Sequence, residues 1–189
     1  MIPPRRLSLA SRSPQRRAIL AQLGFDFAVV ESSYREHDLP GTPAEVALAH
    51  ARGKAGGAPA AELVLGVDTV VDVDGVMLGK PADRAEAAAM LRQLAGRSHA
   101  VHSGICLLSG GVPRQRLATT EVSFRPLCDA DLAWYLATEE WRDRAGGYAV
   151  QGRGAALVTR IAGDYTNVVG LPVAALLDLL GEAGEAVHC

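Results

Sequence analysis

Hydrophobic residues along this chain fall into short segments that predict strands. The segments 7–10, 63–67 and 70–73 are rich in apolar residues, and 25–29 alternates between apolar and polar positions. Asp74-Gly75, between 70–73 and 76–78, predicts a two-residue hairpin turn. Further strands are expected at 99–108, 117–125 and 156–161.

Helix signals separate these segments. Ser13-Pro14 predicts an N-cap followed by a first-turn proline, in a helix that ends at Gly24. Thr42-Pro43-Ala44-Glu45 has the form of a capping box and begins a helix of small residues that runs through position 54. Helices are also expected at 83–96, at 129–138 and at 172–181, the last with Leu176, Leu177 and Leu180 on its buried face. The charged segment 139–147 is expected to be a loop.

Composition narrows the class of protein. The chain has 189 residues, of which 49% are hydrophobic and 21% charged, so it can bury the core of one compact unit. No apolar run is long enough for a membrane span, and no secretory signal is present, so we expect a soluble cytoplasmic protein that binds no membrane. Its cysteines, Cys106, Cys128 and Cys189, lack the spacing of a zinc site or a disulfide framework.

The net charge of −2 gives no overall field that would attract a nucleic acid polymer, so an anionic ligand needs a local basic cluster. Residues 11–17 offer one, in a strand-to-helix loop with free backbone N–H groups. Ser11, Ser13 and Arg16 in this loop suit a phosphate. The alternative is an ordinary capped helix with solvated arginines. The loop lacks the Walker A pattern, which argues against a kinase or GTPase.

Asp68 directly follows an apolar run and is expected at the carboxyl end of a buried strand, where α/β sheets place their ligands. A buried carboxylate needs a metal, a cation or a hydrogen-bond donor as its partner. The alternative is a turn residue at the strand end. Glu36, in a polar segment, is either a second acid of the site or a solvated side chain.

Lys80 follows the predicted hairpin and Asp68 precedes it. This cation and this acid are therefore near each other in the sequence, on either side of a tight turn. Lys54, taken alone, is equally consistent with a surface lysine. Gln151 stands in an apolar and glycine-rich stretch, where its amide could read a base edge or satisfy backbone groups. His99 and His102 are expected on opposite faces of one strand, which makes them a poor metal pair.

Taken together, four ordered motifs resemble the Maf family, also called septum-formation inhibitors. They stand at 9–16, 66–69, 79–81 and 161–172, and the resemblance is strongest over 7–180. It implies one domain over 1–189, with an α/β fold, a central mixed sheet flanked by helices, and a cleft between two lobes. The fold would be similar to that of inosine triphosphate pyrophosphatases, and the family is often homodimeric.

The resemblance also implies an activity, the hydrolysis of a nucleoside triphosphate to the monophosphate and pyrophosphate with Mg²⁺ or Mn²⁺. Asp68 would hold the metal or deprotonate the attacking water, and Glu36 would assist metal binding. Lys80 would act in catalysis by neutralising the triphosphate. The remaining substrate-binding residues would be Ser11, Ser13, Arg16 and Lys54.

Base preference is implied by three positions. Thr69 and Gln151 match the branch of the family that resembles dTTP and UTP pyrophosphatases, whereas a second branch prefers 7-methyl-GTP. Gln15 departs from the first branch, which usually carries Arg there, so a different base preference is one alternative. Another is a regulator of cell division that senses a nucleotide without hydrolysing it, against which Asp68 and Lys80 weigh.

Overall fold

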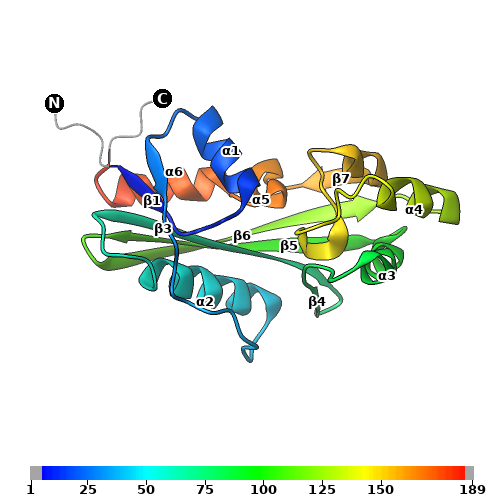
Figure 1. Ribbon diagram of the computed structural model, residues 1–189, viewed down its shortest axis with the longest axis horizontal. Coiled ribbons are helices and arrows are strands. Elements are labelled where there is room, and N and C mark those ends of the chain that lie inside the picture. Colours follow the sequence, from blue (N-terminus) through cyan, green and yellow to red (C-terminus); the bar gives the residue numbers. More distant parts are fainter. Residues whose placement is uncertain (1–5, 186–189) are drawn as a thin grey trace.

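The computed structural model describes residues 6–185, through which one seven-stranded mixed sheet runs (Figure 1). The strand order is β2-β1-β3-β5-β6-β7, with β4 paired to β3. Strand β1 pairs in parallel with β2 and with β3, and the other pairs are antiparallel. The predicted α/β fold with a central mixed sheet flanked by helices is therefore confirmed.

The elements follow the chain in this order. The strands are β1 (Leu7–Leu9), β2 (Phe27–Val29), β3 (Leu63–Val73), β4 (Val76–Leu78), β5 (Ser98–Ser109), β6 (Val112–Phe124) and β7 (Val158–Ala162). The α-helices are α1 (Pro14–Gln22), α2 (Pro43–Gly56), α3 (Arg84–Leu94), α4 (Asp129–Leu136), α5 (Tyr165–Val169) and α6 (Val173–Glu182). Two 3₁₀ turns, η1 (Ala145–Gly147) and η2 (Arg153–Leu157), precede β7.

Strand β3 has a gap along one of its edges. Its other edge pairs with β5 over nearly its whole length. On the gapped edge, β1 pairs with residues 63–65 and β4 with residues 71–73, which leaves 66–70 without a strand partner on that side. The centre of β3 thus lacks a strand neighbour on this side, and the site described below forms at this gap.

The position expected for Asp68 is wrong in one respect. Asp68 lies in the middle of β3 rather than at its end, because Val70 and Val71 continue the strand and Asp68 itself pairs with Gly104. The strand that ends beside it is β1, whose last residue, Leu9, pairs with Leu65. Asp68 therefore lies beyond the end of the neighbouring strand β1. The sheet edge is open beside it, as it would be at the end of its own strand.

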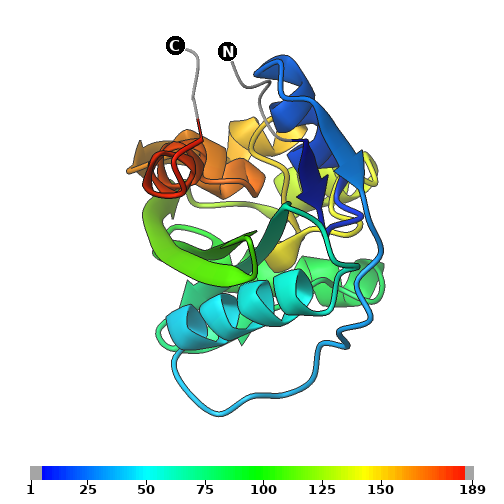
Figure 2. The same ribbon diagram turned by 90° about the vertical axis from the view of Figure 1, so that its left-hand side faces the viewer.

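Helix α2 packs unusually close to one face of the sheet (Figure 2). A Cβ atom at Gly66 would lie 2.2 Å from the carbonyl oxygen of Ala51, and one at Gly104 would lie 2.3 Å from that of Ala47. The two glycines on the sheet therefore allow the helix backbone to approach this closely. It brings the far end of α2, with Lys54, within reach of the centre of β3.

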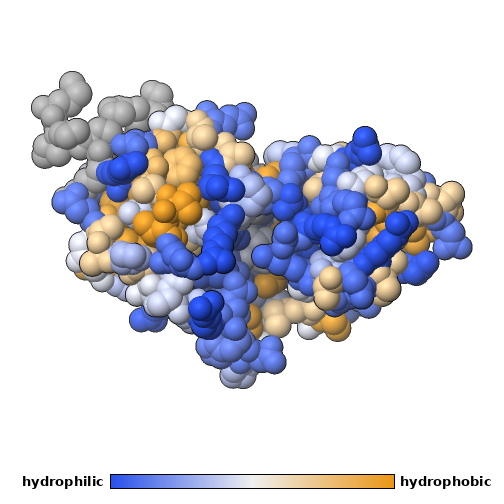
Figure 3. Space-filling view, in the orientation of Figure 1, coloured by the Kyte–Doolittle hydropathy of each residue, from blue (hydrophilic) through white to orange (hydrophobic). Residues whose placement is uncertain are grey.

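Two hydrophobic cores lie at opposite ends of the long strands. One is covered by α1 and α6 and includes Leu20, Leu65 and Leu176. The other is covered by α3 and α4 and includes Val71, Leu91 and Trp141. Figure 3 shows a hollow on the surface between these two ends. The chain is therefore bilobed, as expected, with the central part of the sheet spanning both lobes.

Some predicted boundaries are wrong. Helix α6 continues through Gly181, and Leu179 is buried while Leu177 is only partly buried. A Cβ at Gly181 would meet nothing within 4 Å, so this glycine lies at an unconstrained helical position. Strand β6 begins at Val112 rather than at 117, because polar residues on its exposed hairpin end hide the apolar pattern. Helix α5 was not expected. The hairpin at Asp74-Gly75 is confirmed.

Further expectations concern membranes and cysteines. Within residues 6–185, no helix is long and apolar enough to cross a membrane. Cys106 and Cys128 are free thiols, and burial raises the pKa of Cys106 to about 11. Cys189 lies outside the described residues. His99 Nε2 lies 2.8 Å from the Tyr148 hydroxyl, and His102 Nδ1 lies 2.9 Å from Thr119 Oγ1.

Candidate active site

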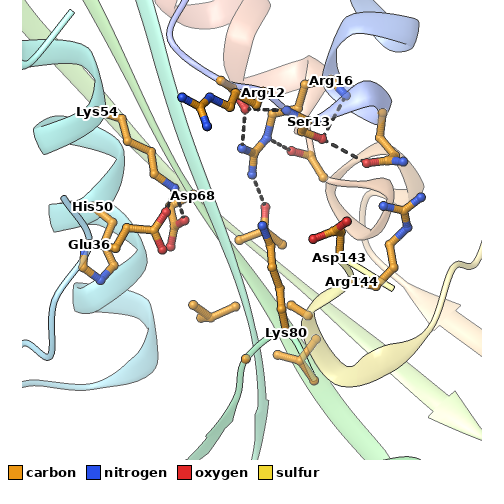
Figure 4. A pocket seen from close by; sticks show the side chains of 18 of the residues that line it. Arg12, Ser13, Arg16, Glu36, His50, Lys54, Asp68, Lys80, Asp143 and Arg144 are labelled. Carbon is orange, nitrogen blue, oxygen red and sulfur yellow. Dashed lines mark hydrogen bonds and ion pairs between the residues drawn. The ribbon is translucent and has the colours of Figure 1, made fainter. Parts of the chain in front are cut away.

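A cavity of about 1080 Å³ lies between the lobes, at the gap in the β3 edge. It is walled by the loop before α1, segment 30–36, one face of α2, the centre of β3, the residues after β4, the loop at 142–145 and the end of α5. Figure 4 shows the polar side chains that point into it. Segments far apart in the sequence thus meet at one place.

Asp68 and Glu36 share one cation. Lys54 Nζ lies 2.6 Å from Asp68 Oδ1 and 2.7 Å from Glu36 Oε1. The side chain of Asp68 is only 10% exposed and that of Lys54 15%, whereas Glu36 is 58% exposed. The partner that a buried carboxylate requires is therefore Lys54. The alternatives of a turn residue at Asp68 and a surface lysine at Lys54 are both wrong.

Segment 30–36 reaches this position because two glycines of the α2 region let it lie close to the helix. A Cβ at Gly53 would fall 2.3 Å from the ring of Tyr34, and one at Gly57 would fall 2.7 Å from the Tyr34 backbone nitrogen. The Tyr34 hydroxyl is 2.9 Å from His50 Nδ1, and Ser33 N–H donates to the Gly57 carbonyl at 2.8 Å. These contacts hold Glu36 beside Lys54.

Tyr34 and His50 line the cavity but were missed in the sequence. Desolvation raises the pKa of the Tyr34 hydroxyl, and the negative charges of Glu36 and Asp68 raise it further. One signal was available, because His50 precedes Lys54 by one helical turn and therefore lies on the same face of α2. Tyr34 carried no such signal, since it lies in an irregular segment.

Arg16 is buried and bound from three directions. Its Nη1 donates to Ser11 Oγ at 2.9 Å, its Nη2 to Thr69 Oγ1 at 3.1 Å and its Nε to the Gly170 carbonyl at 2.8 Å. Burial lowers the pKa of Arg16, while the charges of Asp68 and Glu36 oppose that change. Arg16 is therefore an ordered cation at the cavity wall, and the alternative of a solvated arginine is wrong for this residue.

The loop before α1 presents its hydroxyls beside Arg16. Ser13 caps the helix by accepting from the Arg16 N–H at 3.4 Å, and its Oγ lies 3.0 Å from Gln15 Oε1. Ser13 N–H donates to Ser11 Oγ at 3.3 Å. The positive end of α1 thus faces the cavity with hydroxyl groups and a guanidinium, which is a suitable environment for a phosphate.

Successive residues of β3 face opposite sides of the sheet, and this divides the site. Asp68 points toward α2 and meets Lys54, whereas Thr69 points toward α1 and meets Arg16. Thr69 Oγ1 is also 2.8 Å from Ser103 Oγ on β5. Because the β3 edge is open here, groups from both faces of the sheet reach one cavity.

Lys80 extends into the cavity from the residues after β4 (Figure 4). Within the described part of the chain it has no ion-pair partner. Its segment is held by a backbone hydrogen bond of 3.0 Å from Gly146 N–H to the Gly79 carbonyl. Lys80 is therefore a cation whose charge is available to a ligand.

Gln151 is the predicted site residue that does not line the cavity. It is exposed, and it follows the buried stretch from Tyr148 to Val150. Its assignment to base specificity stays a prediction. The other predicted site residues do line the cavity, namely Ser11, Ser13, Gln15, Arg16, Glu36, Lys54, Asp68, Thr69 and Lys80. Arg12, Asp143, Arg144 and Tyr148 also line it and were not predicted.

The carboxylate pair suits a divalent cation. Residues 6–185 contain no group of three or more side chains of the types that bind metals. However, Lys54 contacts only one oxygen of each acid, which leaves Asp68 Oδ2 and Glu36 Oε2 as donors in the same region. Mg²⁺ is commonly held by one or two carboxylates together with phosphate oxygens of the substrate. The residues present therefore fit such an ion.

The fold and the site together define an α/β protein with a cleft between two lobes, lined by several cations and an acidic pair. Residues 6–183 match the family described as Maf-like protein, and the chain belongs to this family. A relative from Thermus thermophilus is 45% identical over 94% of this chain and 95% of its own length. A relative from Deinococcus radiodurans is 43% identical over 95% of this chain and 93% of its own length. One from Pyrococcus furiosus is 42% identical over 93% of this chain and 94% of its own length. All three are named dTTP/UTP pyrophosphatase.

Proposed function

We propose that this protein is a nucleoside triphosphate pyrophosphatase that hydrolyses dTTP and UTP to the monophosphate and pyrophosphate. The observation that carries the proposal is the placement of Asp68, with Lys54 at 2.6 Å, in one cavity with the cations Arg16 and Lys80. Family membership and the names of the relatives support the same reaction and the same bases.

The phosphates would bind along the basic wall of the cavity. Ser11, Ser13 and the N-terminal end of α1 bind part of the phosphate chain by donating hydrogen bonds to it. Arg16 and Lys80 neutralise its charge. Because Arg16 is already fixed by three hydrogen bonds, it needs no reorganisation when the substrate arrives. The α-phosphorus is then presented toward Asp68.

Asp68 would act as the base. Water attacks the α-phosphorus, the bond from the α-phosphorus to the bridging oxygen breaks, and pyrophosphate leaves with that oxygen. Asp68 accepts the proton that the water loses. Lys54 keeps the carboxylate in place through its 2.6 Å contact, and it places Glu36 in the same region through its 2.7 Å contact.

Asp68 and Glu36 are also the residues that would hold Mg²⁺ or Mn²⁺, together with phosphate oxygens of the substrate. When bound, such an ion supplies Lewis-acid neutralisation of the charge that develops on the phosphates. Each acid has one oxygen on Lys54 and one left over, so Asp68 Oδ2 would either hold the ion or accept the proton of water, and Glu36 Oε2 is left for the ion in both cases.

The experiment is to measure pyrophosphate and monophosphate release from dTTP, UTP, CTP, GTP and 7-methyl-GTP with Mg²⁺ or Mn²⁺. Selective release from dTTP and UTP is the expected result. Turnover of 7-methyl-GTP or GTP alone would overturn the proposed base preference. Gln15, where this chain departs from the dTTP and UTP branch, would then be the first residue to test. Binding of dTTP without any turnover would favour the nucleotide-sensing regulator. The cytoplasmic location and the homodimer stay predictions, and light scattering of the purified chain tests the second.

A further inference from the structure

Arg144 lines the cavity, and its side chain makes no hydrogen bond or ion pair with residues 6–185. Its Nε atom is buried and makes no hydrogen bond, and no acid of the described chain forms an ion pair with it. A buried polar group without a partner is costly, and for a charged group the cost is larger. The guanidinium therefore lacks a negatively charged hydrogen-bond acceptor, and a bound anion would supply one.

The loop that carries Arg144 is firmly held. Trp141, 1% exposed, anchors its start in the hydrophobic core. Gly146 N–H donates to the Gly79 carbonyl at 3.0 Å, and a Cβ at Gly146 would lie 3.0 Å from Val71. Asp143 has a φ of 57°, in the left-handed region that Asp tolerates better than most residues. Arg144 is thus directed toward the cavity by a well-packed loop.

A second arginine in the same loop shows the opposite behaviour. Arg142 donates to Glu139, and its guanidinium lies 4.4 Å from the ring centroid of Trp141. Its charge is therefore matched within the loop itself. Both arginines line the cavity, so of the two it is Arg144 whose Nε is left for a ligand.

The arrangement of charges suggests which part of a nucleotide Arg144 meets. Figure 4 shows Glu36 and Asp68 on one side of the cavity and Asp143 and Arg144 on the other, with Arg16 and Lys80 between them. If the α-phosphate lies at Asp68, the rest of the phosphate chain extends past the cations toward Arg144. The Gly146 to Gly79 hydrogen bond also ties the loop of Arg144 to the segment of Lys80.

We propose that Arg144 binds the β- and γ-phosphates of the substrate, the part that leaves as pyrophosphate, and that it does so together with Lys80. This inference rests on the proposed function. A guanidinium can form two parallel hydrogen bonds to a phosphate, which a lysine cannot reproduce. Arg144 is accordingly a positioning residue for the leaving group rather than a base or a nucleophile.

The test compares Arg144→Ala and Arg144→Lys with the wild-type chain. Steady-state dTTP hydrolysis gives kcat and KM, and product inhibition gives Ki values for pyrophosphate and for dTMP. We expect Arg144→Ala to raise the Ki of pyrophosphate by about tenfold or more, the range of a lost charge-assisted contact. The Ki of dTMP should stay within about twofold, and Arg144→Lys should recover only part of the loss.

Arg153→Ala is the control, because Arg153 is exposed and does not line the cavity, so the substitution removes the same charge from outside the proposed site. Its Ki for pyrophosphate should match that of the wild type. An equal loss in Arg153→Ala, or a changed base preference with an unchanged pyrophosphate Ki in Arg144→Ala, would overturn the inference. Absence of turnover in the wild type would count against the proposed function alone. In that case, calorimetry of pyrophosphate binding with Mg²⁺ to the wild type and to Arg144→Ala still tests the role of Arg144.

Discussion

Lys54 Nζ lies 2.6 Å from Asp68 Oδ1 although the two residues belong to different layers of the fold, a helix and the sheet beneath it. The distance is possible because α2 approaches β3 and β5 over Gly66 and Gly104. A larger residue at either glycine would push the helix away from the sheet. The main acid of the site is therefore positioned by residues that have no chemistry of their own.

Replacement of Asp68 by Asn should abolish most turnover and preserve the fold. The amide is isosteric and can still accept a hydrogen bond from Lys54, but it cannot accept a proton from water. We expect kcat for dTTP to fall by at least about 10²-fold, the scale of a lost general base. Pyrophosphate release measures the rate, and thermal unfolding checks the fold. Near-normal turnover would remove Asp68 from the mechanism.

Metal removal should stop turnover without unfolding the protein. Lys54 already pairs with both Asp68 and Glu36, so one of the two negative charges is balanced in the absence of an ion. We expect EDTA to abolish dTTP hydrolysis, Mg²⁺ or Mn²⁺ to restore it, and the melting temperature to stay unchanged. Glu36→Gln should raise the metal concentration needed for half-maximal activity by about tenfold or more. Full activity in EDTA would contradict the assignment of the metal donors.

Gly53→Ala should lower activity, because its Cβ would fall 2.3 Å from the ring of Tyr34. The clash displaces the segment that holds Glu36, and kcat/KM for dTTP should fall by about tenfold or more, as when a positioned catalytic group is shifted. Gly56→Ala is the matched control on the same helix, since a Cβ there meets nothing within 4 Å. It should leave activity unchanged and stabilise the helix by up to about 1 kcal/mol. Equal activities in the two variants would refute this role of Gly53.

His99 should make the protein less stable in acid. Burial lowers the pKa of His99 from 6.5 to about 4, so the unfolded chain takes up a proton at a pH where the folded chain does not. The stability that neutral His99 contributes is complete above pH 6.5 and is lost as the pH falls from 6.5 toward 4. Since a tenfold change in proton affinity corresponds to about 1.4 kcal/mol, the full loss is on the order of 3 kcal/mol.

Urea unfolding at pH 7 and at pH 4.5 measures this loss. His99→Gln, which cannot titrate and can still hydrogen-bond the Tyr148 hydroxyl, should show a smaller difference between the two pH values than the wild type. His37→Gln, at an exposed histidine, should keep the wild-type difference. The same difference in His99→Gln as in the wild type would show that other groups govern the acid sensitivity.

Local order was largely predictable because its signals are short-range. Ser13-Pro14 and Thr42 through Glu45 begin α1 and α2 by capping, and Asp74-Gly75 forms a tight hairpin, all of which depend only on neighbouring residues. Helix α5 was missed because it is only five residues long and lies in a segment without a clear period. The continuation of α6 through Gly181 was missed because packing of Leu179 and Leu180 outweighs the local cost of a glycine.

The sequence by itself determined which groups could carry chemistry, since the ordered motifs mark Asp68, Lys80 and the loop around Arg16, and the Maf resemblance assigns them a common reaction. Only the tertiary structure decided how they meet. The gap in the β3 edge, the close approach of α2, the pairing of Glu36 with Lys54 and the unpaired guanidinium of Arg144 all depend on contacts between residues far apart in the chain. Such contacts depend on how whole elements pack against one another, and no local pattern of residues encodes them.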